Sequence, residues 1–344
     1  MSVPIVAVGA RTPLGYQAAS SAAAVRCGLA QFRDHPFMVD GVGNALRSAL
    51  DDGLDPTRLG AIRQLTIARS ALREALSGIA LEPGASPRLD VLLSVPEVRP
   101  GFSATNAAWV ARELTQGVSS EPAELAASGH AGSLDALRDA VLRIDEGRAD
   151  LCAIVGVDSY FSPDTIDWLA GHRRLTGEGN RDGFIPGEAA GCVVVASSYA
   201  RSALQLPALA LVRGAHSARE SVLLSSNDEI LGHGLSEAIL GAAGSLRLPA
   251  EAIDEVFSDI NGERYRTDEW CMALLRTSHV LRSVQYQIPA SCWGDAGAAS
   301  GALGCMLAIR AWLRNYANGP RALVWGSSEG GLRSAVVLEQ VGGA

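Results

Sequence analysis

The sequence predicts an α/β protein built from two similar halves. Short apolar runs alternate along the 344 residues with segments whose apolar residues recur every three to four positions, a pattern typical of strands alternating with helices. A weak internal repeat relates residues 129–156 to residues 294–326, because each runs from a Gly and an Ala-Gly turn through a helix to an apolar strand. Hydrophobic residues make up 48% of the chain, which is enough to bury a large core.

The individual elements follow from this alternation. Strands are expected at 3–10, 88–95, 150–157, 190–197, 208–215, 255–260, 321–327 and 335–341, and helices at 101–116, 134–144 and 235–246. No linker or low-complexity tract divides the chain, so we expect an N-terminal half over 1–205 and a C-terminal half over 206–344. The repeat predicts a pseudo-symmetry that places His130 and Asp295 near each other.

Composition excludes several classes of function. The formal net charge is −8 with no basic stripe, so neither nucleic acid nor an anionic membrane surface is an expected partner. No apolar run reaches the roughly 20 residues that span a bilayer, and the N-terminus resembles a first strand more than a signal peptide. A cytoplasmic protein is expected. The six cysteines are scattered without metal-ligand spacing, which favours reduced, mostly buried thiols and predicts neither a metal nor a cofactor.

Lysine is absent from the sequence. All 29 basic residues are arginine. Mechanisms that depend on a lysine, such as Schiff-base formation or a Walker-type phosphate loop, are therefore excluded.

Five segments together resemble the β-ketoacyl synthases of the thiolase superfamily. They occur in the order found in that family and cover nearly the whole chain: VAVGARTPLG (6–15), HAGSLDAL (130–137), RDGFIPGEAAGCVVV (181–195), GDAGAASG (294–301) and EGGLRSAVVLE (329–339). The resemblance implies a thiolase-like fold, with two pseudo-symmetric α/β halves and five-stranded sheets in a layered αβαβα arrangement. It also implies a dimer, for which a homodimer is the expectation.

The resemblance also locates the family's catalytic positions. The nucleophilic Cys at a helix N-terminus falls on His130, the first catalytic His on Asn261, the supporting Lys on Ala290 and the second His on Asp295. All four residues differ from the family pattern, and condensation needs a thiolate. Condensation is therefore not expected. Cys292 lies three residues before Asp295 and is expected to be a core thiol.

Two interpretations of the altered site stay open. His130 and Asp295 can form a dyad that acts as general base in a hydrolase or acyltransferase, or they can be mutually satisfied polar residues that refill a site without chemistry. Next to them, Glu263, Arg264 and Arg266 in the loop 262–270 indicate either binding of a partner or anion, or a salt-bridged, solvated loop.

The leading hypothesis is a non-catalytic ketosynthase-like protein that acts by binding, as a scaffold or adaptor. Short proteins of this kind are similar to ones associated with bacterial type VI secretion effector clusters, which suggests an effector adaptor. The alternatives are an acyltransferase or hydrolase that uses His130 and Asp295, and an inactive, chain-length-factor-like subunit of a ketosynthase heterodimer. A protein partner is expected, with acyl-CoA or acyl carrier protein as candidate ligands. The polar, Gly-rich segment 172–183 is expected to be a flexible surface loop.

Overall fold

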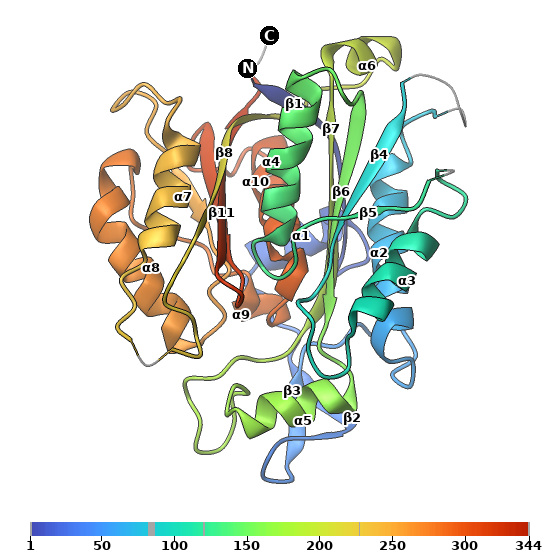
Figure 1. Ribbon diagram of the computed structural model, residues 1–344, viewed down its shortest axis with the longest axis vertical. Coiled ribbons are helices and arrows are strands. Elements are labelled where there is room, and N and C mark those ends of the chain that lie inside the picture. Colours follow the sequence, from blue (N-terminus) through green and yellow to red (C-terminus); the bar gives the residue numbers. More distant parts are fainter. Residues whose placement is uncertain (1, 82–86, 120, 227, 343–344) are drawn as a thin grey trace.

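A computed structural model describes residues 2–81, 87–119, 121–226 and 228–342 (Figure 1). Nine strands within these ranges form one hydrogen-bonded sheet in the order β5-β4-β6-β7-β1-β8-β11-β10-β9. They are β1 (Val3–Arg11), β4 (Leu89–Ser94), β5 (Glu124–Leu125), β6 (Leu151–Ser159), β7 (Glu188–Ala196), β8 (Ala210–Arg219), β9 (Glu255–Phe257), β10 (Arg321–Ser327) and β11 (Leu332–Gln340). Two further strands, β2 (Arg33–Val39) and β3 (Ala45–Ser48), pair only with each other.

The sheet consists of two parts joined along one short seam. Five strands end at β1, four begin at β8, and antiparallel pairing of Val3, Pro4 and Ile5 with Val212, Leu211 and Ala210 connects them. Of the expected five-stranded sheets, the first part has its five strands, whereas the second has four among the described residues, and the two form one sheet. Pairing at the seam satisfies backbone groups that two separate sheets would leave as open edges.

The helices form three layers around this sheet, which confirms the αβαβα arrangement (Figure 1). In the middle lie α4 (Gly132–Asp145) and α10 (Ser300–Leu313), which share a core with β1, β6, β7, β8, β10 and β11. The outer face of the first part carries α2 (Gly60–Leu76) and α3 (Ala104–Leu114), and that of the second carries α7 (His233–Ala243) and α8 (Arg264–Thr277). The remaining helices are α1 (Ala18–Arg26), α5 (Pro163–Gly171), α6 (Ser198–Ala203), α9 (Ala290–Trp293) and the 3₁₀ turns η1 (Ser278–Val280) and η2 (Gly297–Ala299).

The middle layer is apolar on nearly all sides. Eleven of the 14 residues of α10 are buried, as expected for a helix enclosed by protein rather than bordering water. Small residues let it approach α4, because a Cβ on Gly301 would lie 2.5 Å from Leu134 Cγ. Close packing of these two helices is what brings their N-terminal ends, and the residues just before them, together.

All eight strands predicted from the sequence are present, with boundaries that differ by a few residues. The missed strands are the two-residue β5 and the β2–β3 hairpin, which projects with α5 from the end of the molecule opposite the chain termini (Figure 1). β2 has the sequence RDHPFMV, in which charged residues and a proline obscure any alternation. The division of the chain at residue 205 stays a prediction.

Three expectations from composition concern membranes, metals and thiols. Within the part of the chain that the structure describes, no helix has the length and hydropathy needed to cross a bilayer. Those same residues contain no group of three or more His, Cys, Asp or Glu side chains placed to hold a metal ion. Of the six cysteines, all unpaired, four are buried, and Cys27 and Cys271 are exposed.

Candidate functional site

His130 lies immediately before the buried helix α4. The preceding residue, Gly129, has φ = +77°, a left-handed conformation that favours glycine, and a Cβ there would lie 2.7 Å from Ser328 Oγ. Ser328 Oγ in turn accepts a hydrogen bond from the backbone N–H of Ala131 (3.0 Å). The turn before α4 is therefore fixed against the segment that follows β10, and the direction of the His130 side chain is fixed with it.

The structure brings His130 and Asp295 into direct contact, as the pseudo-symmetry predicts. His130 Nε2 lies 2.8 Å from Asp295 Oδ1 and 3.1 Å from Oδ2. The two residues are 165 positions apart in the chain, and both are almost completely buried. They meet because each stands just before one of the two packed middle helices.

Asp295 is held as a carboxylate by several donors. Besides His130, Asn261 Nδ2 donates to Oδ2 (2.5 Å) and the backbone N–H of Gly297 donates to Oδ1 (2.7 Å). Asn261 therefore lies beside the His130–Asp295 pair. A buried carboxylate is costly unless its lone pairs are used, and these contacts use both oxygens.

Arg266 completes the cluster from helix α8. Its Nη2 lies 3.2 Å from His130 Nδ1 and 3.3 Å from Nε2, while Nη1 donates to Asp259 Oδ2 and to the carbonyl oxygen of Ser327, both at 2.8 Å. The expectation of a solvated loop over 262–270 is therefore wrong. Arg264 begins α8 and is exposed, but Arg266 faces inward, because its guanidinium is the counter-charge of buried carboxylates.

Charge coupling sets the ionisation of the pair. Burial lowers the pKa of His130, and so does the Arg266 guanidinium, but the Asp295 carboxylate outweighs them and raises the pKa above its ordinary value. Burial favours a higher pKa for Asp295, but His130, Arg266 and Asn261 hold that pKa well below its usual range. The raised pKa of His130 and the lowered pKa of Asp295 both favour the imidazolium–carboxylate form of the pair.

This pair makes stability depend on pH. Because the folded-state pKa of His130 is raised above 6.5, the stabilisation from His130 is fully present below pH 6.5 and is lost as the pH rises through the folded-state value. Because the pKa of Asp295 is lowered from 3.8, its contribution is present above pH 3.8 and is lost only in stronger acid. The difference in unfolding free energy between wild type and His130→Gln, measured by urea titration, should be largest between these two values and shrink above them. A difference that is flat or rises above pH 6.5 would contradict the assignment.

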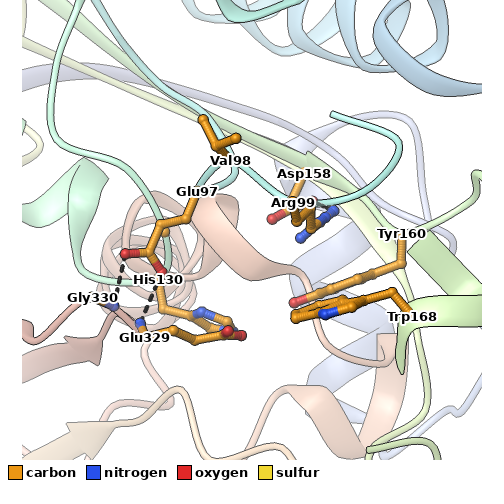
Figure 2. A pocket seen from close by; sticks show the side chains of 10 residues that line it. Glu97, Val98, Arg99, His130, Asp158, Tyr160, Trp168, Glu329 and Gly330 are labelled. Carbon is orange, nitrogen blue, oxygen red and sulfur yellow. Dashed lines mark hydrogen bonds and ion pairs between the residues drawn. The ribbon is translucent and has the colours of Figure 1, made fainter. Parts of the chain in front are cut away.

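A cavity of about 270 Å³ opens beside His130 (Figure 2). It lies at the carboxyl ends of the parallel strands β4 and β6, a usual place for ligands in α/β sheets. Its lining comprises Glu97, Val98, Arg99, Gly129, His130, Asp158, Tyr160, Trp168, Glu329 and Gly330. These lining residues include no cysteine, serine, threonine or lysine.

Glu97 connects the two parts of the fold across the cavity wall. Its carboxylate accepts hydrogen bonds from the backbone N–H groups of Glu329 (2.9 Å) and Gly330 (2.8 Å), drawn as dashed lines in Figure 2. Glu97 follows β4, and Glu329 and Gly330 form the turn between β10 and β11. The closing Gly-Gly hairpin of the sequence therefore forms part of the cavity wall.

The segment 172–183 is not a surface loop throughout. Arg174 is buried and bridges Glu263 (2.7 Å from Nε) and Glu329 (2.6 Å from Nη1). Leu175 is buried as well. The sequence expectation of a flexible surface loop is therefore wrong for this part of the segment, because the ion pairs of Arg174 hold it against the cavity wall.

Ala290 and Cys292 lie apart from the cavity lining. Ala290 is the first residue of the short helix α9 and is half-buried. Cys292 is buried in the same helix, as expected for a core thiol, with Sγ 3.8 Å from Ser291 Oγ. Of the four positions singled out by resemblance, the structure unites His130, Asn261 and Asp295.

Most of the lining residues escaped the sequence analysis. Arg99, Asp158, Tyr160 and Trp168 come from three separate segments and belong to none of the motifs. Asp158 and Tyr160 follow the apolar run of β6. Their position at the carboxyl end of a strand is the one feature of the sequence that indicates a ligand site there.

Comparison with known proteins shows which solved structures share the fold of this chain. No protein-family model and no curated sequence matches the chain. Among solved structures, a chain of the AntDE:AntF complex, a type II PKS acyl-carrier protein with its ketosynthase, matches with a TM-score of 0.81 at 16% identity over 99% of both chains. The ishigamide ketosynthase/chain length factor matches with a TM-score of 0.80 at 17% identity, also over 99% of both chains. The ketosynthase from module 6 of the bacillaene synthase of Bacillus subtilis 168 matches with a TM-score of 0.77 at 14% identity, over 99% of this chain and 72% of that one.

The chain thus has a fold like that of the ketosynthases. At these levels of identity the likeness concerns the fold, and function depends on the site that this chain has built upon it.

Proposed function

We propose that this protein is a ketosynthase-like subunit that acts by binding, in complex with another protein, and forms no acyl-enzyme of its own. The observation that carries the proposal is the His130–Asp295 contact. At the helix terminus where the resemblance places a nucleophile, the side chain is an imidazole engaged with a buried carboxylate and a guanidinium.

Three buried thiols of the chain give no substitute nucleophile. Burial raises the pKa of Cys152 and Cys305 to about 12 and raises that of Cys192 further, so these groups stay protonated and unreactive. No cysteine belongs to the lining of the cavity as the structure describes it.

The general-base alternative is less well supported. A general base needs a ring nitrogen within reach of a substrate proton. His130 Nε2 faces Asp295, and Nδ1 has Arg266 Nη2 at 3.2 Å. Both nitrogens therefore face protein groups rather than a substrate proton, which favours the interpretation that the site holds no general base.

A role like that of a chain length factor fits the comparisons best. The chain matches 99% of a chain in an acyl-carrier-protein–ketosynthase complex and in a ketosynthase/chain length factor, against 72% of a ketosynthase from a modular synthase. This agreement in length supports a protein partner, with an acyl carrier protein as a candidate ligand; the homodimer stays an alternative. Nothing in the comparisons supports a link to type VI secretion, and the proposal leaves it out.

Intact-protein mass spectrometry tests the absence of acyl-enzyme chemistry. Wild-type protein incubated with octanoyl-CoA and malonyl-CoA should gain no mass and release no carbon dioxide from malonyl-CoA, because no thiol lines the cavity beside His130. Any background hydrolysis of the donors should be equal in wild type, His130→Ala and His279→Ala, the last being a control at an exposed histidine on η1. An acyl adduct, or turnover lost in His130→Ala alone, would establish an enzyme instead.

Co-expression with the condensing ketosynthases of the same organism tests the partner. A stable complex should elute from size-exclusion chromatography with one of them. Elution as a homodimer in every combination would contradict a heteromeric role.

A further inference from the structure

Most carboxylate oxygens around the cavity beside His130 accept a hydrogen bond, whereas several of its donors are free. Glu97 accepts two backbone N–H groups, Asp158 accepts from Arg99 Nη2 (2.6 Å) and the N–H of Ala298 (3.2 Å), and Glu329 pairs with Arg174. Buried polar groups in folded proteins are generally paired in this way. The polar groups of the lining that remain unpaired therefore decide which ligand the cavity can bind.

Those remaining groups are donors. The side-chain hydrogen bonds that Arg99 makes to described residues all come from Nη2, so its Nη1 has no hydrogen-bond partner among them. The side chain is nine-tenths buried, and its guanidinium lies 4.3 Å from the centre of the Tyr160 ring. Tyr160 Oη and Trp168 Nε1 make no hydrogen bond to a described residue, and both side chains line the cavity, the hydroxyl pointing toward His130 (Figure 2). Burial, with Asp295 and Asp158, keeps the pKa of Tyr160 well above its usual value, so the hydroxyl remains a donor.

The charge around the cavity selects among acceptors. Counting the lining residues and the ion-paired side chains connected to them, carboxylates outnumber cations even when His130 is an imidazolium. The cations are Arg99, His130, Arg174 and Arg266, and the carboxylates are Glu97, Asp158, Asp259, Glu263, Asp295 and Glu329. This excess of negative charge opposes an anionic ligand, while the free N–H groups of Arg99 oppose a cationic one.

We propose that the cavity binds an uncharged carbonyl group, of an amide or ester, through hydrogen bonds donated by Arg99, Tyr160 and Trp168. Val98, 72% exposed, stands at the mouth of the cavity and offers apolar contact to the rest of such a molecule. The volume of about 270 Å³ accommodates a group of a few heavy atoms. The site lies within this chain and needs no partner subunit.

Three probes of nearly equal size and different charge test the proposal: butyramide, butyrate and butylamine. Titrated into the full chain and followed by saturation-transfer NMR, butyramide should bind at least tenfold more tightly than either charged probe. Tighter binding of butyrate would make the cavity an anion site, and tighter binding of butylamine would make it a cation site. No detectable binding of butyramide at about 100 mM, a concentration that reveals even very weak affinity, would overturn the proposal.

Variants locate the binding. Tyr160→Phe and Trp168→Phe each remove one donor and should weaken butyramide about three- to tenfold, the usual effect of a single neutral hydrogen bond. Tyr199→Phe, at an exposed tyrosine on α6, is the matched control and should bind like wild type. Equal affinity in all three variants would refute the assigned donors. Because the chain is tested alone, failure here is distinguishable from failure of the partner proposal.

Discussion

Asp295→Asn is expected to lower the free energy of unfolding by about 3–5 kcal/mol, the usual cost of removing one partner from a buried ion pair. The carboxylate faces His130, and Arg266 contacts the same imidazole. Asparagine keeps the shape of the side chain but leaves the buried imidazolium of His130 without its counter-charge, while Arg266 keeps its ion pair with Asp259. Chemical denaturation at pH 6 measures the loss.

Two further variants show whether the stability lost in Asp295→Asn comes from the buried ion pair. Asp135→Asn breaks a half-exposed pair with Arg138 on α4 and should change stability by less than about 1 kcal/mol. In the cycle with His130→Gln, the double variant should lose less than the sum of the single losses, because the two residues are in contact. A loss below about 1 kcal/mol for Asp295→Asn, or strict additivity in the cycle, would show that the pair is not ionised as assigned.

Arg63→Met should cost a similar amount, about 3–5 kcal/mol, at a site outside the cavity lining. Arg63 on α2 is fully buried and forms a bidentate pair with Glu188 at the start of β7, with distances of 2.5 and 2.6 Å. Glu188 also accepts from the N–H of Asp51 (2.8 Å) and from Ser159 Oγ (3.0 Å). Without the guanidinium, this carboxylate is buried and uncompensated.

The double variant Arg63→Met/Glu188→Leu separates charge from packing. Replacing a whole buried pair by apolar groups of similar volume is often neutral, so the double variant should recover most of the stability lost in Arg63→Met. Arg148→Met removes an exposed pair with Glu146 and serves as the surface control. If the double variant is less stable than the single one, the pair contributes through its hydrogen bonds to α2, β7 and their neighbours rather than through charge balance.

The fold was accessible from the sequence because its elements are long, apolar and periodic. β6 and β7 are buried along their whole length, and buried strands of this kind appear as continuous apolar runs. The internal repeat gave the pseudo-symmetry, and with it the meeting of His130 and Asp295. Short or polar elements such as β5 and β2 carry no such signal and were missed.

The residues that surround the His130–Asp295 pair could be identified only from the tertiary structure. Arg266 and Arg174 lie in segments that the sequence predicts to be solvated or flexible loops, because charged residues usually face water. Their burial depends on partners that include distant segments of the chain: the Ser327 carbonyl oxygen as well as the nearby Asp259 for Arg266, and Glu263 and Glu329 for Arg174. Local sequence contains no information about such distant partners.

The sequence by itself determined the α/β class, the thiolase-like order of motifs and the absence of lysine from any mechanism. Those properties follow from composition and from local periodicity, which act over a few residues. Only the tertiary structure decided that the two parts share one nine-stranded sheet, that His130 is engaged by Asp295 and Arg266, and that Arg99, Tyr160 and Trp168 line one cavity. Each of these depends on long-range packing and on the cost of burying charge, which is settled when distant segments meet.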